Sequence, residues 1–254
     1  MAMFAGASTQ GSILPGAFTV LNASIRANVS KGLLVIEGGG TVGKSTAPTR
    51  LSALNYNTRV LTRPKTVMRA LDAIYDPSRV LFVFNGHGLN DIPGTPQTAD
   101  GDKILIHFVG ADSDFPCDQD DNAEPPTENI WLHWSEVTNK LQGQPAHYKF
   151  VFLNSCSCGS QYQFWMQAFK AKAFFGWEYP VLLVTAQSFD RVFWDEMLDV
   201  EQHDYNVRSV HDETVRILKK DGKFVGPIKD KDGNILVWDS PVYEENEAGF
   251  TLPY

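Results

Sequence analysis

The chain has 254 residues, a formal net charge of −8 and 43% hydrophobic residues. This length is enough for one large domain or two small ones. The negative charge argues against a nucleic-acid partner, because a phosphate backbone calls for clustered Lys and Arg. No stretch approaches the roughly 18 uninterrupted apolar residues of a membrane span, so no membrane association is predicted.

Three cysteines, Cys117, Cys156 and Cys158, are too few for a disulfide framework, and their odd number argues against one as well. This usage favours a reducing compartment. The N-terminus has neither the basic start nor the continuous apolar core of a signal peptide. The sequence therefore predicts a cytoplasmic protein.

Residues 1–31 are rich in Ala, Gly, Ser and Asn without a sustained period, which predicts an N-terminal extension followed by one domain over 32–254. In chain order the next segments predict a strand at 33–38, a short helix at 45–54, a strand at 58–63, a helix at 66–76, and strands at 80–88 and 102–110. The second half predicts a helix at 130–143, a strand from 149 to the cysteines, a helix at 161–172, a strand at 173–177, helices at 181–198 and 207–222, and a hairpin at 229–238.

Strands that alternate with helices in this way predict an α/β fold, a mostly parallel sheet with helices on both faces. No internal repeat or low-complexity linker interrupts the pattern. A single domain is therefore the simplest interpretation of 32–254.

Two of the predicted strands end at residues that can carry chemistry. The segment LFVFNGHG contains His87, between Gly86 and Gly88, and the segment FVFLNSC ends at Cys156. Active sites of open α/β sheets gather at the carboxyl ends of strands, so the imidazole and the thiol would meet if these strands are neighbours. A thiolate is a strong nucleophile, and an imidazole can take the thiol proton or donate one to a leaving amine. The amide N–H groups of Gly88 and Cys156 are predicted to stabilise the oxyanion.

A strand ending in His-Gly, followed by a helix and a strand ending in Ser-Cys, resembles the caspase-like cysteine peptidases, which include caspases, metacaspases, gingipains and CHAT-type domains. AKAFFGWEYPV and FDRVFWDEML also resemble the strand and helix after the nucleophile in bacterial members. The resemblance covers 33–222. It implies a caspase-like fold and a cysteine endopeptidase that hydrolyses a protein or peptide substrate through a thioester intermediate.

The same resemblance implies that Cys156 is the nucleophile and His87 its acid–base partner. Cys158 is the weaker candidate, because the nucleophile of the family lies closer to the strand end. Members that cleave after basic residues often carry Asp two positions before the nucleophile, where this chain has Asn154. Asn154 is therefore predicted to bind substrate, with no defined side-chain preference.

A second class of function is nucleotide binding. GGGTVGKS, which starts at Gly38 and ends at Ser45, matches the phosphate-loop pattern, and Lys44 would hold phosphates with the backbone amides. Pro48 in the following helix counts against it, as do strands that end in Asn rather than in the Asp of a magnesium site. A third interpretation is a catalytically silent caspase-like scaffold, against which the retention of both His87 and Cys156 counts.

The stretch 112–124 is acidic and contains prolines, which predicts a solvated loop. Its aspartates lack EF-hand spacing, so no cofactor is predicted, and a regulatory calcium ion remains the alternative. The two neighbouring cysteines have no second ligand pair, so no metal site is predicted. His203 and His211 lie on a charged stretch and are predicted at the surface.

Overall fold

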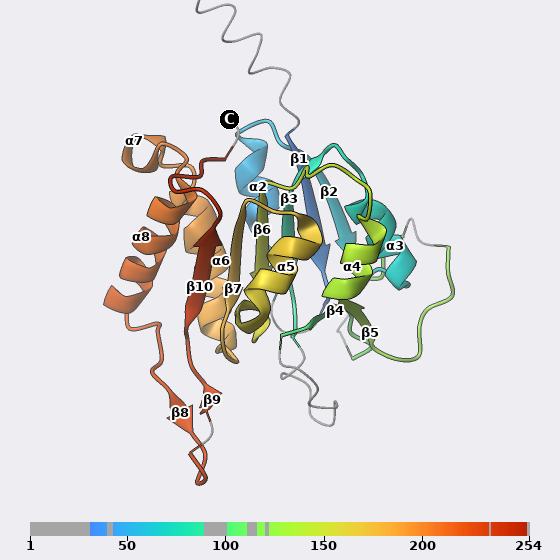
Figure 1. Ribbon diagram of the computed structural model, residues 1–254. Coiled ribbons are helices and arrows are strands. Elements are labelled where there is room, and N and C mark those ends of the chain that lie inside the picture. The colour runs from blue at the N-terminus through green and yellow to red at the C-terminus, as the bar shows by residue number, and fades with distance from the viewer. Residues whose placement is uncertain are drawn as a thin grey trace, which may run out of the picture. The chain divides into compact units, whose positions relative to one another are not determined.

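The computed structural model describes residues 31–39, 43–88, 101–110, 116–119, 122–233 and 235–252. Its central feature is a six-stranded sheet with strand order β10-β7-β6-β3-β1-β2 (Figure 1). Every neighbouring pair is parallel except β10 with β7. The strands are β1 (Gly32–Glu37), β2 (Asn57–Thr62), β3 (Arg79–Asn85), β6 (Phe150–Asn154), β7 (Ala173–Trp177) and β10 (Pro241–Glu245). The predicted N-terminal extension lies outside the described residues apart from Lys31.

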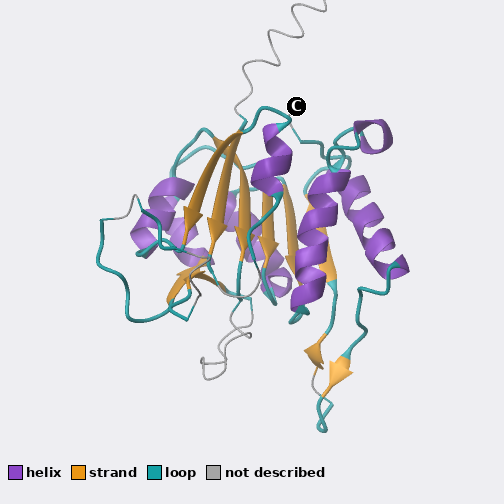
Figure 2. Ribbon diagram, turned by 180° about the vertical axis from the view of Figure 1, so that it is seen from behind, coloured by secondary structure: helices purple, strands orange, loops and turns teal. Residues whose placement is uncertain are grey.

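Helices cover both faces of this sheet, which Figures 1 and 2 view from opposite sides. They are α2 (Ala47–Ser52), α3 (Val67–Ile74), α4 (Trp134–Lys140), α5 (Tyr162–Phe169), α6 (Leu183–Glu196), α7 (Val200–His203) and α8 (Val207–Lys220). Buried side chains of α3, α4 and α5 form one core, and those of α2, α6 and α8 form the other. The predicted α/β fold class is confirmed. None of the helices in the described ranges combines the length and apolar character of a membrane span.

The central strands are apolar at nearly every position because each one faces two cores. In β1, Leu34 and Ile36 belong to the core of α3, α4 and α5, whereas Leu33 and Val35 belong to the opposite core. Successive side chains of a strand point to opposite faces, so a strand covered on both sides needs a continuous apolar run. This is the physical reason why the runs could be recognised in the sequence.

One predicted helix, at 130–143, is in fact a strand followed by a helix. Residues Ile130–His133 form β5, which pairs antiparallel with β4 (Lys103–His107) in a separate two-stranded sheet. His133 ends the strand, because its side chain accepts a hydrogen bond from Ser135 N while the Glu136 carboxylate accepts one from His133 N. This capping box starts α4 one residue later.

Two further differences lie near the C-terminus. The predicted hairpin is present as β8 (Ile228–Lys229) and β9 (Ile235–Val237), which pair antiparallel. Strand β10 was not predicted. It begins with Pro241 and ends with two glutamates, a composition tolerated at a sheet edge but untypical of a strand.

The acidic stretch is less solvated than its composition predicts. Asp118 is only 8% exposed, and its carboxylate accepts a hydrogen bond of 2.8 Å from Arg69 Nε of α3. Lys65 Nζ donates to the carbonyl of Ala123 over 2.9 Å. The prediction of a solvated loop is therefore wrong at Asp118. The other aspartates on which the calcium alternative depends, at 112, 114, 120 and 121, lie outside the described residues.

The prediction of surface positions for His203 and His211 is also wrong, because both are buried. His203 Nδ1 lies 2.8 Å from Ser209 Oγ, and its Nε2 lies 3.2 Å from a carboxylate oxygen of Glu196. The ring of His211 stacks on that of Tyr243, with centroids 5.5 Å apart. His203 ends α7 and His211 lies on the buried face of α8 beside Val207 and Val210, so the charge of the surrounding sequence did not indicate their burial.

We expect His211 to make the fold sensitive to mild acid. Burial lowers the pKa of His211 below its usual 6.5, and the hydrogen bond to Asp212 opposes this. As the pH falls below the usual pKa of histidine, the unfolded chain binds more protons than the folded one. Stability that is present at neutral pH is therefore lost toward acid. A His211→Phe variant keeps a ring against Tyr243 but cannot titrate. Its free energy of unfolding in urea should fall less than that of the wild type between about pH 7.5 and about pH 5.5. Parallel pH curves for the two proteins would contradict this.

Candidate active site

The carboxyl ends of β3 and β6 lie side by side. The two strands are parallel neighbours in a register that pairs Asn85 with Asn154, the last residue of each. Just beyond the pair, Gly86 N donates a 3.4 Å hydrogen bond to the carbonyl of Asn154. His87 and Cys156 each follow their strand end by two residues. The topology therefore brings the two chain segments to the same edge of the sheet.

The segments of His87 and Cys156 are in direct backbone contact through Gly88. A β-carbon built on Gly88 would lie 2.1 Å from the carbonyl oxygen of Cys156, a distance no side chain can occupy. Glycine is required here because the backbones approach so closely. On its other side, the His87 carbonyl accepts a 3.0 Å hydrogen bond from Leu105 N of β4. The His87 segment is thus held between β4 and the end of β6.

The His87 side chain is half-buried and packs edge-on against the ring of Phe108, with centroids 5.5 Å apart. Phe108 follows β4, and its N–H donates a 3.0 Å hydrogen bond to the carbonyl of Gly38 after β1. The contact that orients the imidazole is therefore tied to the central sheet.

The Cys156 sulfur contacts the segment 178–182, which follows β7. We call this segment the strap. Val181 N donates a hydrogen bond of 3.1 Å to Cys156 Sγ, and the Val181 carbonyl oxygen lies 3.8 Å from the same sulfur. The shorter contact, from the N–H donor, favours the charged thiolate, whereas the carbonyl oxygen accepts from the neutral thiol over the longer distance. Cys156 is 3% exposed, whereas Cys158 is fully buried in the core with its sulfur 3.6 Å from Ser155 Oγ. All three cysteines of the chain are free thiols.

The residue after Cys156 has an unusual backbone conformation. Ser157 has φ 61° and ψ −6°, in the left-handed region that non-glycine residues rarely occupy. It is buried, and its N–H donates a 3.3 Å hydrogen bond to the carbonyl of Tyr179 in the strap. Such conformations persist where surrounding contacts impose them, and they concentrate at functional sites. The turn separates Cys156 from the short 3₁₀ helix at Cys158–Gln161.

Asn154, predicted to bind substrate, is fully buried with both ends of its amide engaged inside the protein. Its Oδ1 accepts a 2.8 Å hydrogen bond from Trp177 Nε1, and its Nδ2 donates to Asn85 Oδ1 over 2.7 Å and to the Ala186 carbonyl over 3.0 Å. This network joins β3, β6 and β7 to α6. The Asn154 side chain therefore fixes the carboxyl ends of β3, β6 and β7 from inside the protein. The signal for it in the sequence was that two neighbouring strands both end in Asn.

The phosphate-loop pattern is only partly described, because residues 40–42 lie outside the described ranges. Ser45 Oγ donates a 2.7 Å hydrogen bond to one carboxylate oxygen of Asp190, and Thr46 N donates one of 2.7 Å to the other. Asp190 is buried, and this burial raises its pKa. The hydroxyl and amide that a phosphate would need here thus face a carboxylate. Helix α2 begins only at Ala47, and nothing in this geometry supports nucleotide binding.

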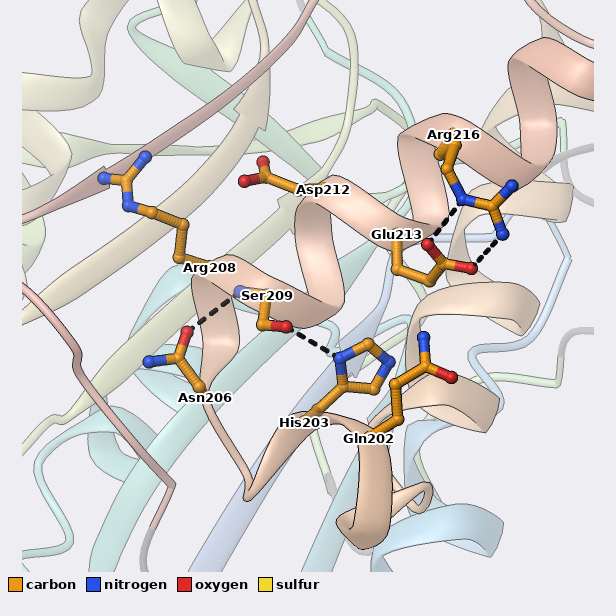
Figure 3. Close-up of a pocket in the computed structure, with 8 residues that line it drawn as sticks. All are labelled: Gln202, His203, Asn206, Arg208, Ser209, Asp212, Glu213 and Arg216. Atoms are coloured by element: carbon orange, nitrogen blue, oxygen red, sulfur yellow. Dashed lines mark hydrogen bonds and ion pairs between the residues drawn. The ribbon is translucent and has the colours of Figure 1, made fainter.

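A separate pocket of about 580 Å³ lies at α7 and the first turns of α8 (Figure 3). In Figure 1, α7 lies at the end of the sheet opposite to the arrowheads of β1 and β2. The basic side chains of the pocket are paired, Arg216 with Glu213 and Arg208 with Glu245. The pocket is lined by Gln202, His203, Asn206, Arg208, Ser209, Asp212, Glu213 and Arg216, none of which comes from β3, β6 or the strap.

No family model matches the sequence, and no curated protein matches it. Among solved structures, the chain is similar to a secreted C11 cysteine protease from Bacteroides thetaiotaomicron, determined in complex with an irreversible peptide inhibitor. The two share 12% sequence identity with a TM-score of 0.46, over 85% of this chain. This chain spans 66% of the length of that protease.

Proposed function

We propose that the chain is a cysteine endopeptidase with Cys156 as nucleophile and His87 as acid–base partner. The observation that carries the proposal is the backbone contact between Gly88 and Cys156, because it holds residue 87 beside residue 156 at the carboxyl edge of the sheet. The motif resemblance to caspase-like peptidases supports the same roles.

In this mechanism the Cys156 thiolate attacks the carbonyl carbon of the substrate and forms a C–S bond. The amide N–H groups of Gly88 and Cys156 are the proposed donors to the resulting oxyanion. As the C–N bond breaks, the His87 imidazolium gives its proton to the departing amine, which leaves a thioester on Cys156. Water then attacks the thioester, with neutral His87 taking its proton, and the thiolate is restored. No cofactor is needed for either half of the reaction.

We propose that a pocket at the end of β3 receives a substrate side chain. It has a volume of about 310 Å³ and includes Asn85, two residues before His87, and Val184, three residues after Val181. Two cationic side chains, Lys44 and Arg191, line it and are exposed, whereas the Asp190 carboxylate is engaged by Ser45 and Thr46. We therefore propose that an acidic or neutral polar side chain is preferred over a basic one. The pocket is lined by Gly43, Lys44, Thr46, Asn85, Val184, Gln187, Ser188, Asp190 and Arg191.

Peptides that carry a thiol-reactive ketone in place of the scissile bond test this proposal. Three peptides that differ only in an Asp, Gln or Lys before the ketone should each add one equivalent to Cys156, found by intact mass and peptide mapping. The Asp and Gln peptides should react roughly fivefold faster than the Lys peptide, the size of a single exposed charge interaction.

Cys156→Ser should prevent the adduct, and the matched variant Cys158→Ser should keep it. Two results would favour the silent-scaffold interpretation. One is labelling of the folded wild-type protein at Cys117 or Cys158 in place of Cys156. The other is a rate with the peptide ketones no higher than the rate with a ketone that lacks a peptide. Faster reaction of the Lys peptide would contradict only the pocket preference.

A further inference from the structure

Residues 238–240, just before β10, contact the strap on the side that faces away from Cys156. Glu178 N donates a 2.9 Å hydrogen bond to the carbonyl of Ser240, and Trp238 N donates one of 3.0 Å to the carbonyl of Pro180. The rings of Tyr179 and Trp238 stack with centroids 5.0 Å apart. The strap therefore lies between the Cys156 turn and this C-terminal segment.

At the centre of this segment, Asp239 contacts two other parts of the chain, the start of α6 and residue 225. Its Oδ1 accepts from Leu182 N over 3.2 Å, and its Oδ2 accepts from Val225 N over 2.6 Å. Thr185 Oγ1 lies 2.9 Å from Oδ2 and 2.7 Å from the carbonyl oxygen of Lys223, so its single proton has two acceptors. Asp239 is 4% exposed, so these contacts are shielded from water. A buried carboxylate that accepts from two backbone N–H groups fixes the segments that supply them.

Asp239 also supplies the cap that α6 lacks. Leu182 is the N-cap residue of α6 and has no side chain that can accept a hydrogen bond from the first turn. The Asp239 carboxylate accepts from the N–H of Leu182 itself, as the Glu of a capping box does, and the helix dipole favours a negative charge at this end. Because Val181 is the residue before Leu182, the same contact sets the position of the Val181 amide.

We propose that Asp239 is a positioning residue that keeps the Val181 N–H on the sulfur of Cys156 and so favours the thiolate. This inference rests on the proposed function, in which that thiolate is the nucleophile. Asp239 holds the peptide unit between Val181 and Leu182 by its N–H, and the Val181 N–H that meets the sulfur belongs to the preceding peptide unit, joined to it at the Val181 α-carbon.

The pH dependence of Cys156 reactivity can report on this role. Titratable side chains on the segments around the sulfur are His87 before Gly88, Cys158 after the turn, Glu178 and Tyr179 in the strap, and Asp239 itself. Removing the negative charge of Asp239 would by itself make the thiolate easier to form. Loss of the Val181 hydrogen bond makes it harder to form, so the two effects have opposite signs.

The experiment measures the rate of alkylation of Cys156 by iodoacetamide from about pH 5 to about pH 10, with peptide mapping and with Cys117 as an internal reference thiol. In either orientation of the side-chain amide that Asp239→Asn creates, the NH₂ group faces the backbone N–H of Leu182 or of Val225. Two donors then face each other, and one of the hydrogen bonds to residue 239 is lost. The midpoint of the rate profile should rise by about one pH unit, and the rate at pH 7 should fall roughly fivefold to tenfold with the alkaline plateau unchanged. Asp232→Asn, the same change on the exposed hairpin, should leave the profile as in the wild type.

A midpoint that stays or falls in folded Asp239→Asn would overturn the proposal, as would faster alkylation at every pH, which would make the strap a simple cover. Should Asp239→Asn fail to fold, Thr185→Val removes the hydroxyl beside the carboxylate, together with its contact to the Lys223 carbonyl, without a change of charge. A smaller upward shift of the midpoint is expected there, and an unchanged one overturns the proposal. Alkylation needs no substrate, so an absence of peptidase activity would leave this test intact.

Discussion

Replacement of Cys156 by alanine is expected to lower kcat/KM for peptide hydrolysis by roughly 10⁴-fold or more, because covalent catalysis cannot proceed without the nucleophile. The measurement uses a peptide that carries the residue preferred in the labelling experiment. The variant should stay folded, because the loss of the buried sulfur and of its hydrogen bond from Val181 N costs only about 1–2 kcal/mol.

Two companion variants make this result specific. Cys158→Ala removes a sulfur from the core and should cost about 1 kcal/mol of stability while hydrolysis continues. His87→Ala should lower kcat/KM roughly 10³-fold, and the double variant with Cys156→Ala should be no worse than Cys156→Ala alone, because the two residues act as one unit. Hydrolysis that survives in Cys156→Ala but not in Cys158→Ala would move the nucleophile two residues along the chain.

The second large effect is expected from Gly88→Ala. The new methyl group would meet the Cys156 carbonyl oxygen at 2.1 Å, so the backbone on one side of the site must move. A displacement of about 1 Å at a reacting group can cost roughly 100-fold in rate, and we expect kcat/KM to fall by at least this amount. Alkylation of Cys156 by iodoacetamide should change as well, because the strained contact includes its own carbonyl group.

Gly226→Ala is the matched control for this prediction. A β-carbon there has open space around it, and the backbone does not need glycine. This variant should keep full activity and change stability by no more than about 1 kcal/mol. If Gly88→Ala keeps activity within about twofold of the wild type, the contact is not part of the site and the proposed pairing of His87 with Cys156 loses its main support.

Some features of this site could be read from local patterns alone. The apolar runs around Leu33, Phe82 and Phe152 predicted buried strands because a strand covered on both faces must be apolar at each position. The alternation of these runs with amphipathic helices predicted the α/β class, which is confirmed. The end of each run then indicated which residues reach the carboxyl edge, among them His87 and Cys156.

Other features depend on partners far away in the sequence, and no local pattern could reveal them. The helix expected at 130–143 is divided by the pairing of Ile130–His133 with β4, because tertiary pairing overrode the helical pattern of the segment. Asp118 was expected in water, but Arg69 of α3 binds it. The charged surroundings of His211 predicted exposure, although the packing of α8 on β10 buries it.

Local patterns therefore predicted most of the strands and helices, though not β5 or β10, and the two candidate side chains His87 and Cys156 near strand ends. Only the tertiary structure decided that β3 and β6 are neighbours, that Gly88 touches Cys156, and that the strap places Val181 on the sulfur. It alone showed Asn154 and Asp239 as buried hydrogen-bonding centres. The physical reason is that burial and periodicity act within a segment, whereas a hydrogen bond such as that from Leu182 to Asp239 joins residues 57 positions apart.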